Sequence, residues 1–278
     1  MLAALIIVFR EVFEAGLVIG IVMAVTRGVA HRSQWIAGGV LAGTFGACIV
    51  ALFTSTISAA FAGVGQELFD ATILAIAVVM LTWHNVWMAR HGRELAAEMR
   101  AAGEAVVSGS KSLAGLGIVV AVAVLREGVE VVLFLYGVIA SEGGSELGVF
   151  IGGVGGLVLG AAVCILTYRG LLTIPSRYLF NVTSIMIAFL AAGMAAQAIF
   201  FLEQANVVTR LATIVWDSSW ILSDKSLPGR ALHTLIGYSD QPTAMELVVY
   251  LATLATIFIL MRIFAPARPV RPAVPVAR

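Results

Sequence analysis

The chain has 278 residues, of which 60% are hydrophobic and only 12% are charged, and its formal net charge is +1. Soluble domains carry about 25% charged residues, so this composition excludes an ordinary water-soluble protein, and the near-neutral charge gives no reason to expect a nucleic-acid partner. A membrane-spanning helix needs about 20 mainly apolar residues, so the length is better counted in spans than in soluble domains.

Seven stretches are long and apolar enough to span a membrane, which predicts an all-α membrane protein with seven transmembrane helices. They are residues 2–26, 35–61, 68–89, 112–140, 147–168, 178–202 and 244–264. A polar, helix-prone linker is predicted at 90–111. A mixed segment at 203–243 is predicted to form a partly helical cap in the outer interface. The Pro- and Arg-rich tail at 265–278 is predicted to be disordered.

The first span contains charges where a span should be apolar. Its sequence includes the motif Arg10-Glu11-Val12-Phe13-Glu14, and the fourth span contains Arg126-Glu127-Gly128-Val129-Glu130, 116 residues later. A cleavable signal peptide should not carry such charges in its apolar core. An ionisable residue at the centre of a bilayer costs at least about 2.5–3.5 kcal/mol, so six of them in two matching clusters need a compensating interaction.

The other spans repeat in the same order. The second span has Gly39, Gly43 and Ala47 at four-residue spacing, and the fifth has Gly148, Gly152, Gly156 and Gly160. The third span opens Leu68-Phe69-Asp70 and the sixth opens Leu179-Phe180-Asn181. Residues 1–89 and 112–202 are therefore predicted to be two three-helix repeats. Because each has an odd number of spans, they are predicted to be inverted, with 244–264 as an added helix. The small residues are explained by close helix packing.

The basic residues predict the orientation. Threading seven spans puts twelve Lys and Arg side chains on one side and only Arg210, Lys225 and Arg230 on the other. Positive charge marks the cytoplasmic side, so the N-terminus is predicted to lie outside and the C-terminus inside. Most acidic loop residues fall outside, where they would concentrate cations, although ordinary solvated loops explain them as well.

The two motifs predict a cation site. Within each motif the glutamates are three residues apart and share one helix face, so Glu11, Glu14, Glu127 and Glu130 can surround one small volume. With Arg10 and Arg126 the charges sum to −2, which suits a metal cation, and carboxylate oxygens are hard ligands. Two alternatives stay open. The arginines can simply pair with Glu14 and Glu130 and lock the helices together, or the glutamates can relay protons.

The doubled motif, the seven spans and the Trp216–Tyr238 stretch resemble the high-affinity iron permease family, and at this size its bacterial Efe-type ferrous iron permeases. The resemblance covers essentially the whole chain. It implies import of iron ions across the cytoplasmic membrane, with the four motif glutamates as iron ligands, Arg10 and Arg126 as supporting partners and no tightly bound cofactor. It also implies, as partners, a periplasmic iron-binding protein and a haem peroxidase or oxidase. One similar branch is associated with lead, so another metal is an alternative substrate.

Five further residues are candidates for the ion path. Asp70 and Asn181 stand near opposite membrane faces, His84 is in the inner part of the third span, and Gln197 and Glu203 are near the outer end of the sixth. Each also has a structural explanation, as a helix start, a packing residue or a loop acid. A membrane sensor or assembly protein with structural ion pairs is the competing functional class. No phosphate-binding loop of the G-x-x-x-x-G-K-[ST] type occurs, so no ATP-driven step is expected.

Overall fold

The computed structural model describes residues 1–60, 65–142, 146–170, 176–224 and 226–264. Within these ranges the chain is all-α, as predicted, and its only extended pairing is a bridge between Ile214 and Thr243. The predicted disorder of the 265–278 tail concerns residues outside the described part. The helices are α1 (Leu2–Val25), α2 (Arg32–Ala60), α3 (Gln66–Val107), α4 (Leu113–Glu142), α5 (Glu146–Tyr168), α6 (Ser176–Gln204), α7 (Leu227–Ile236) and α8 (Ala244–Ile263).

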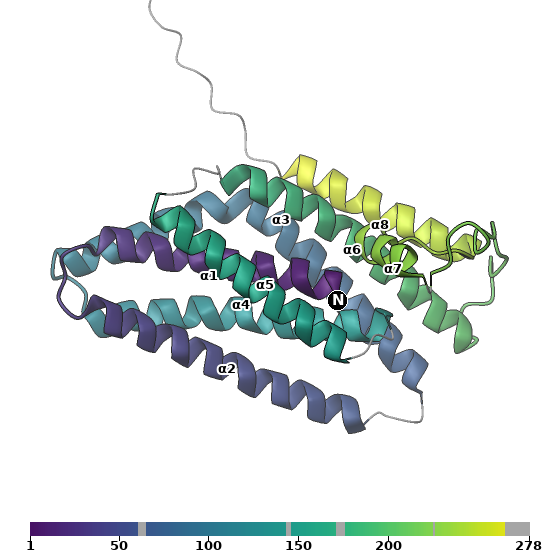
Figure 1. Ribbon diagram of the computed structural model, residues 1–278, viewed down its shortest axis with the longest axis horizontal. Coiled ribbons are helices and arrows are strands. Elements are labelled where there is room, and N and C mark those ends of the chain that lie inside the picture. Colours follow the sequence, from purple (N-terminus) through teal and green to yellow (C-terminus); the bar gives the residue numbers. More distant parts are fainter. Residues whose placement is uncertain (61–64, 143–145, 171–175, 225, 265–278) are drawn as a thin grey trace, which may run out of the picture.

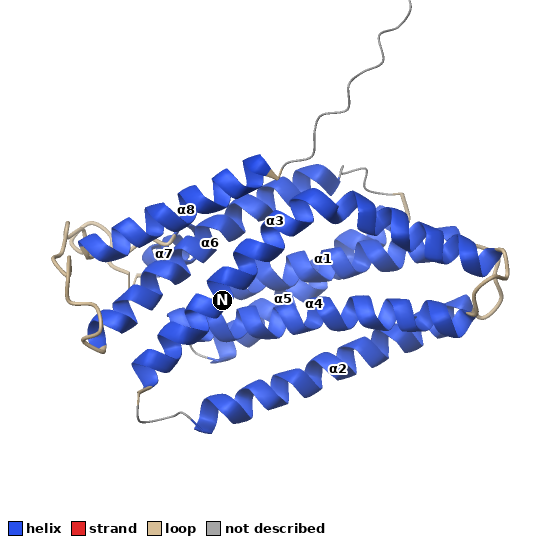
Figure 2. Cartoon of the chain, turned by 180° about the vertical axis from the view of Figure 1, so that it is seen from behind, coloured by secondary structure: helices blue, strands red, loops and turns tan. Residues whose placement is uncertain are grey.

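The long helices lie side by side in one bundle, with α2 at one edge beside α4 and α8 at the opposite edge beside α6 (Figures 1 and 2). Five helical segments are long and apolar enough to cross a membrane: Arg32–Phe53, Gln66–Met88, Leu147–Tyr168, Asn181–Gln204 and Ala244–Ile263. Helices α1 and α4 have sufficient length, 24 and 30 residues, but each carries a charged motif. The outward faces are rich in large apolar side chains such as Phe45, Trp83 and Phe150, as expected of a multi-pass membrane protein.

Small residues bring two helix pairs into backbone contact. A Cβ added at Gly43 of α2 would lie 2.6 Å from the Ala121 carbonyl oxygen of α4, and one added at Gly156 of α5 would lie 2.5 Å from the Leu5 carbonyl oxygen of α1. Ordinary van der Waals contact begins at about 3.4 Å, so neither position has room for a side chain. The glycine ridges therefore fit the small-residue packing that the sequence predicts. They fix α1 against α5 and α4 against α2.

Helix α3 is longer than the predicted third span. It runs without a break from Gln66 to Val107, so the boundary predicted at residue 89 and most of the predicted 90–111 linker lie inside one helix. No proline interrupts this stretch. In its second half Val106 is buried against Val22 of α1, while Glu98 and Arg100 are exposed. The predicted helix-prone linker is thus a continuation of α3 that packs along the bundle.

In the described residues between α6 and α8 there is one short helix, α7. Ser226 caps the first turn of α7 by accepting a hydrogen bond from the Gly229 N–H at 3.0 Å, and α7 ends at Gly237, whose φ is +68°. The Tyr238 hydroxyl donates to the Leu222 carbonyl at 2.9 Å. Helix α8 then begins with a capping box between Thr243 and Glu246. This segment is partly helical, as the sequence predicts for 203–243.

Candidate metal site

The first charged motif is buried in the middle of α1. Arg10, Glu11 and Glu14 are 1–3% exposed, because α3, α4 and α5 pack around this part of α1. Arg10 Nε donates to Glu14 Oε1 at 2.8 Å, an i, i+4 pair along the helix. Glu11 is about one helical turn from Glu14 on the same face of α1. Among the described residues neither of its carboxylate oxygens has a hydrogen-bond donor. A buried carboxylate without a donor is costly, and the His84 ring of α3 stands near it without a hydrogen bond, with its Nε2 3.9 Å from Glu11 Oε2.

The second motif repeats the ion pair in α4 but is less enclosed. Arg126 Nε lies 3.2 Å from Glu130 Oε1 and 4.0 Å from Glu127 Oε1. The Arg126 side chain is 37% exposed, against 1% for Arg10, and its guanidinium carbon lies 4.5 Å from the ring centroid of Trp87 on α3. A cation–π contact of this kind stabilises a guanidinium that the protein does not fully enclose.

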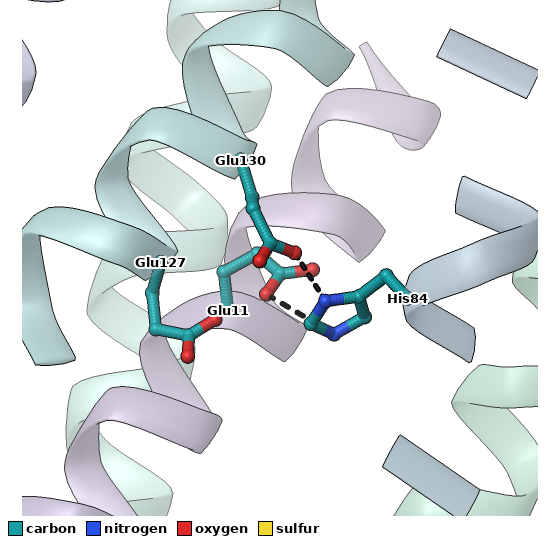
Figure 3. A group of neighbouring side chains, drawn as sticks. All are labelled: Glu11, His84, Glu127 and Glu130. Carbon is teal, nitrogen blue, oxygen red and sulfur yellow. Dashed lines mark ion pairs between the residues drawn. The ribbon is translucent and has the colours of Figure 1, made fainter. Parts of the chain in front are cut away.

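His84 of α3 stands between the two motifs. Its ring is 4% exposed, its Nδ1 contacts the Glu130 carboxylate, and its Nε2 lies 3.3 Å from Glu14 Oε2. Ligand atoms of Glu11, His84, Glu127 and Glu130 all lie within 4.8 Å of one another. Figure 3 shows the three carboxylates and the imidazole ring converging from α1, α3 and α4. Three oxygens and one nitrogen at such separations can coordinate a single metal cation.

The comparisons with known proteins concern nearly the whole chain. The model of the iron permease FTR1 family matches residues 1–268. The chain belongs to this family. It is 32% identical over 273 residues to the ferrous iron permease EfeU of Yersinia pestis, covering 96% of this chain and 95% of that protein. It is 33% identical over 267 residues to EfeU of Yersinia pseudotuberculosis serotype I, covering 94% and 92%. It is 32% identical over 259 residues to EfeU of Escherichia coli O6:H1, covering 90% and 91%. No solved structure matches the chain.

Family membership makes this chain a membrane permease, that is, a transporter and not an enzyme. The resemblance drawn from the doubled motif is thereby confirmed. The residues that converge from α1, α3 and α4 therefore lie in the interior of a transporter of the iron permease family. Buried ionisable residues in such proteins commonly mark the path of the substrate.

A pocket of about 360 Å³ opens beside the site in this permease. It lies between α3 and α4, and its lining includes Trp83, His84, Trp87, Arg126 and Glu130. Glu130 and Arg126 are consequently the most exposed members of the two motifs. The second motif is thus the more exposed wall of the site, and the first motif is the more enclosed wall.

The remaining sequence candidates are outside the four-residue group. Asp70 is half-buried near the start of α3, and Asn181 is exposed near the start of α6. Gln197 is half-buried in α6, and Glu203, near the end of that helix, accepts a hydrogen bond from the Thr243 hydroxyl at 3.0 Å.

The structure places two of the predicted residues differently from what the sequence suggests. His84, a sequence candidate for the ion path in the inner part of the third span, lies among the motif carboxylates. Glu14, expected as one of four equal ligands, has one oxygen on Arg10 and the other facing His84. No spacing rule in the sequence connects a single histidine of the third span with motifs in the first and fourth, so only the packing of α3 against both helices brings it there.

Proposed function

We propose that this permease imports iron ions across the cytoplasmic membrane through one midplane site shared by the two Arg-Glu-x-x-Glu motifs. One observation carries the proposal: ligand atoms of Glu11, Glu127, Glu130 and His84 all lie within 4.8 Å of one another. In addition, Glu11 has no hydrogen-bond donor among the described residues. Relatives at 32–33% identity are named ferrous iron permeases, which supports iron as the substrate.

The charges support a cation as the guest. Glu11, Glu14, Glu127 and Glu130 carry four negative charges if all are ionised, and the two motif arginines carry two positive ones. The sum of −2 is unfavourable inside a bilayer, and a divalent ion neutralises it. A cation that arrives from water exchanges its hydration shell for these oxygens and leaves when the site opens to the other side.

The proposed topology has seven spans, with α1 and α4 added to the five apolar ones. Helices α1–α3 and α4–α6 would form two inverted repeats, and α8 would be the additional span. Matched contacts support this: Gly43 faces Ala121 and Leu125 of α4, and Gly156 faces Leu5 and Phe9 of α1. The glycines are 113 residues apart and both partners are 116 residues apart, so each repeat's second helix packs on the other's first helix in the same register. Inverted repeats meet at the midplane, where the motifs would form one site.

The side of entry follows from the basic residues. The excess of Arg and Lys in the loops after α1, α5 and α8 and in the second half of α3 supports an outer N-terminus and a cytoplasmic C-terminus. The ion would then come from the side of α7, whose flanking segments contain Asp217, Asp224 and Asp240. A periplasmic iron-binding protein and a haem peroxidase or oxidase are the partners that the family resemblance implies for this side.

The competing function is a membrane sensor or assembly protein whose motifs are only structural ion pairs. The Arg10–Glu14 and Arg126–Glu130 pairs favour it. Purely structural pairs, however, should leave few buried polar atoms unpaired. Within the described residues the Arg10 terminal nitrogens and both Glu11 oxygens have no hydrogen-bond partner. Replacing Arg10, Glu11 and Glu14 together with Leu separates the two functions, since apolar replacement of a structural ion pair is often neutral, whereas a transporter would lose its site.

Iron uptake in cells tests the proposal. Cells that depend on this permease would carry the wild-type chain, Glu11→Ala, Glu127→Ala or the double variant, with membrane insertion checked by immunoblotting. We expect each single variant to lose most uptake because both motifs contribute to the same site. Wild-type uptake by a correctly inserted double variant would show that the ion does not pass between these carboxylates.

A further inference from the structure

His84 faces carboxylates of both motifs, with the second motif at one ring nitrogen and the first motif at the other. Its Nδ1 contacts Glu130 of α4, and its Nε2 lies 3.3 Å from Glu14 Oε2 and 3.9 Å from Glu11 Oε2 of α1. The ring is 4% exposed and is therefore shielded from bulk water. A histidine held only for packing would need one acceptor, whereas this ring faces acceptors on two sides.

We propose that His84 coordinates the transported ion through Nδ1 while Glu14 holds the ring through Nε2, and that this nitrogen makes the site select transition-metal ions over Ca²⁺ and Mg²⁺. The inference rests on the proposed function, because it assigns roles within the same site. It makes His84 a specificity-determining ligand. It also makes Glu14 a positioning residue rather than a fourth equal ligand.

The contacts of Glu14 support its positioning role. Its Oε1 accepts the Arg10 Nε–H at 2.8 Å, and its Oε2 faces His84 Nε2. A histidine that binds a metal commonly donates its other ring N–H to a carboxylate, which fixes the tautomer and the ring plane. Arg10 fixes Glu14, Glu14 then fixes the Nε2–H tautomer of His84, and Nδ1 is left with its lone pair toward Glu130 and the ion.

The second repeat has no equivalent of this ring. The third and sixth helices correspond with an offset of 111 residues, which aligns His84 with Ala195 of α6. Ala195 is buried and its methyl group cannot bind a metal. Glu14 and Glu130 therefore occupy the same position of the same motif but have different tasks: Glu14 orients an imidazole, and Glu130 faces the ion.

The proposed selectivity for transition-metal ions follows from the mixture of carboxylate oxygens and one imidazole nitrogen in the site. Ca²⁺ takes six to eight oxygen ligands, and Mg²⁺ prefers an octahedron of oxygens and water. A site of carboxylates alone would accept both. Imidazole nitrogen suits iron and later transition metals, so replacing one oxygen donor by His84 Nδ1 weakens the binding of Ca²⁺ and Mg²⁺ relative to Fe²⁺. With His84→Glu the site becomes all-oxygen, and we expect the preference for Fe²⁺ over Ca²⁺ to fall by at least about tenfold.

Competition binding measures this preference. The purified full-length permease in lipid nanodiscs is titrated with Fe²⁺ under anaerobic conditions, with and without excess Ca²⁺, for wild type, His84→Glu, Glu14→Gln and the loop control His31→Gln. We expect His84→Glu to keep metal binding and lose selectivity, Glu14→Gln to lose about 10–100-fold in Fe²⁺ affinity, and His31→Gln to match wild type. Unchanged Fe²⁺ over Ca²⁺ preference in a folded His84→Glu protein would overturn the proposal.

A spectroscopic measurement keeps the test valid if His84→Glu does not fold. The chain has four histidines, and replacing His31, His91 and His233 with Gln leaves His84 as the sole imidazole. Pulsed electron paramagnetic resonance of Cu²⁺ bound to this variant should show coupling to an imidazole nitrogen. Bound Cu²⁺ without such coupling would overturn the assignment of His84 as a ligand.

The two proposals fail in distinguishable ways. If Fe²⁺ binds equally well after Glu11→Gln and Glu127→Gln are combined, the shared carboxylate site is wrong and the proposed function fails. If Fe²⁺ binding requires those glutamates but the selectivity is unaffected by His84→Glu, only the role of His84 is wrong.

Discussion

Adding one methyl group to a glycine ridge should damage both the packing and the site. In Gly43→Ala the new Cβ would lie 2.6 Å from the Ala121 carbonyl oxygen and 2.9 Å from the Leu125 backbone nitrogen. Both neighbours are backbone atoms of α4, so no side-chain rotation relieves the clash. Reaching the 3.4 Å of ordinary contact requires α2 and α4 to separate by about 0.8 Å. Overpacking of this kind costs about 1–3 kcal/mol.

The separation has a functional consequence because Leu125 directly precedes the second motif. A shift of α4 would move Glu127 and Glu130 relative to α1, so we expect iron uptake to fall together with stability. Gly156→Ala is the equivalent change in the other repeat, with 2.5 Å to the Leu5 carbonyl oxygen and 2.8 Å to the Phe9 nitrogen. It should cost a similar amount if the two repeats pack alike.

Thermal unfolding of the purified protein, followed by size-exclusion chromatography after heating, measures the loss. Gly38→Ala is the matched control, since a Cβ at Gly38 meets no atom within 4 Å among the described residues. We expect Gly43→Ala and Gly156→Ala to melt several degrees below Gly38→Ala. Equal melting temperatures for Gly43→Ala and Gly38→Ala would refute the close α2–α4 contact, and a large difference between Gly43→Ala and Gly156→Ala would refute equivalent packing.

Three further predictions concern other parts of the molecule. Trp87→Leu removes the cation–π contact of Arg126, and the resulting loss of about 0.5–2 kcal/mol should appear as a lower melting temperature than that of Trp83→Leu, a neighbouring indole without that contact. Glu14→Gln keeps the volume of the side chain but weakens the orientation of His84, so iron uptake should decrease less than with Glu11→Gln in the same cells. Burial, and then the neighbouring Asp240 carboxylate, raise the pKa of Asp224 in the outer segment. Its ionised form therefore destabilises the fold above the ordinary Asp pKa, and Asp224→Asn should raise the melting temperature more at pH 7 than at pH 4.

The sequence predicts the parts of this structure that depend on local patterns. Apolar runs separated by polar links indicate the helices, and the four-residue glycine spacing indicates close packing. The buried charges of Arg10 to Glu14 and Arg126 to Glu130 indicate a site, because charges inside apolar helices need a partner. Each of these signals is contained in one helix.

Features that depend on the packing of several helices could not be predicted in the same way. His84 is a single residue in an apolar span, and its place between Glu14 and Glu130 depends on how α3 crosses α1 and α4. The unequal exposure of Arg10 and Arg126 has no counterpart in the two nearly identical motifs. The helix-prone character of 90–111 is visible in the sequence, but its continuity with the third span in one helix to Val107 is not, because no local signal shows whether the chain turns between the two.

The central claim is that the two motifs form one site and not two. Equilibrium dialysis of the purified permease against Fe²⁺ under anaerobic conditions, with the iron and protein both quantified, tests it most directly. One high-affinity iron per chain is expected, and Glu11→Gln or Glu127→Gln alone should each abolish it, since the ion is shared between α1 and α4. Two irons per chain, or the loss of only half of the bound iron in each single variant, would contradict a shared site.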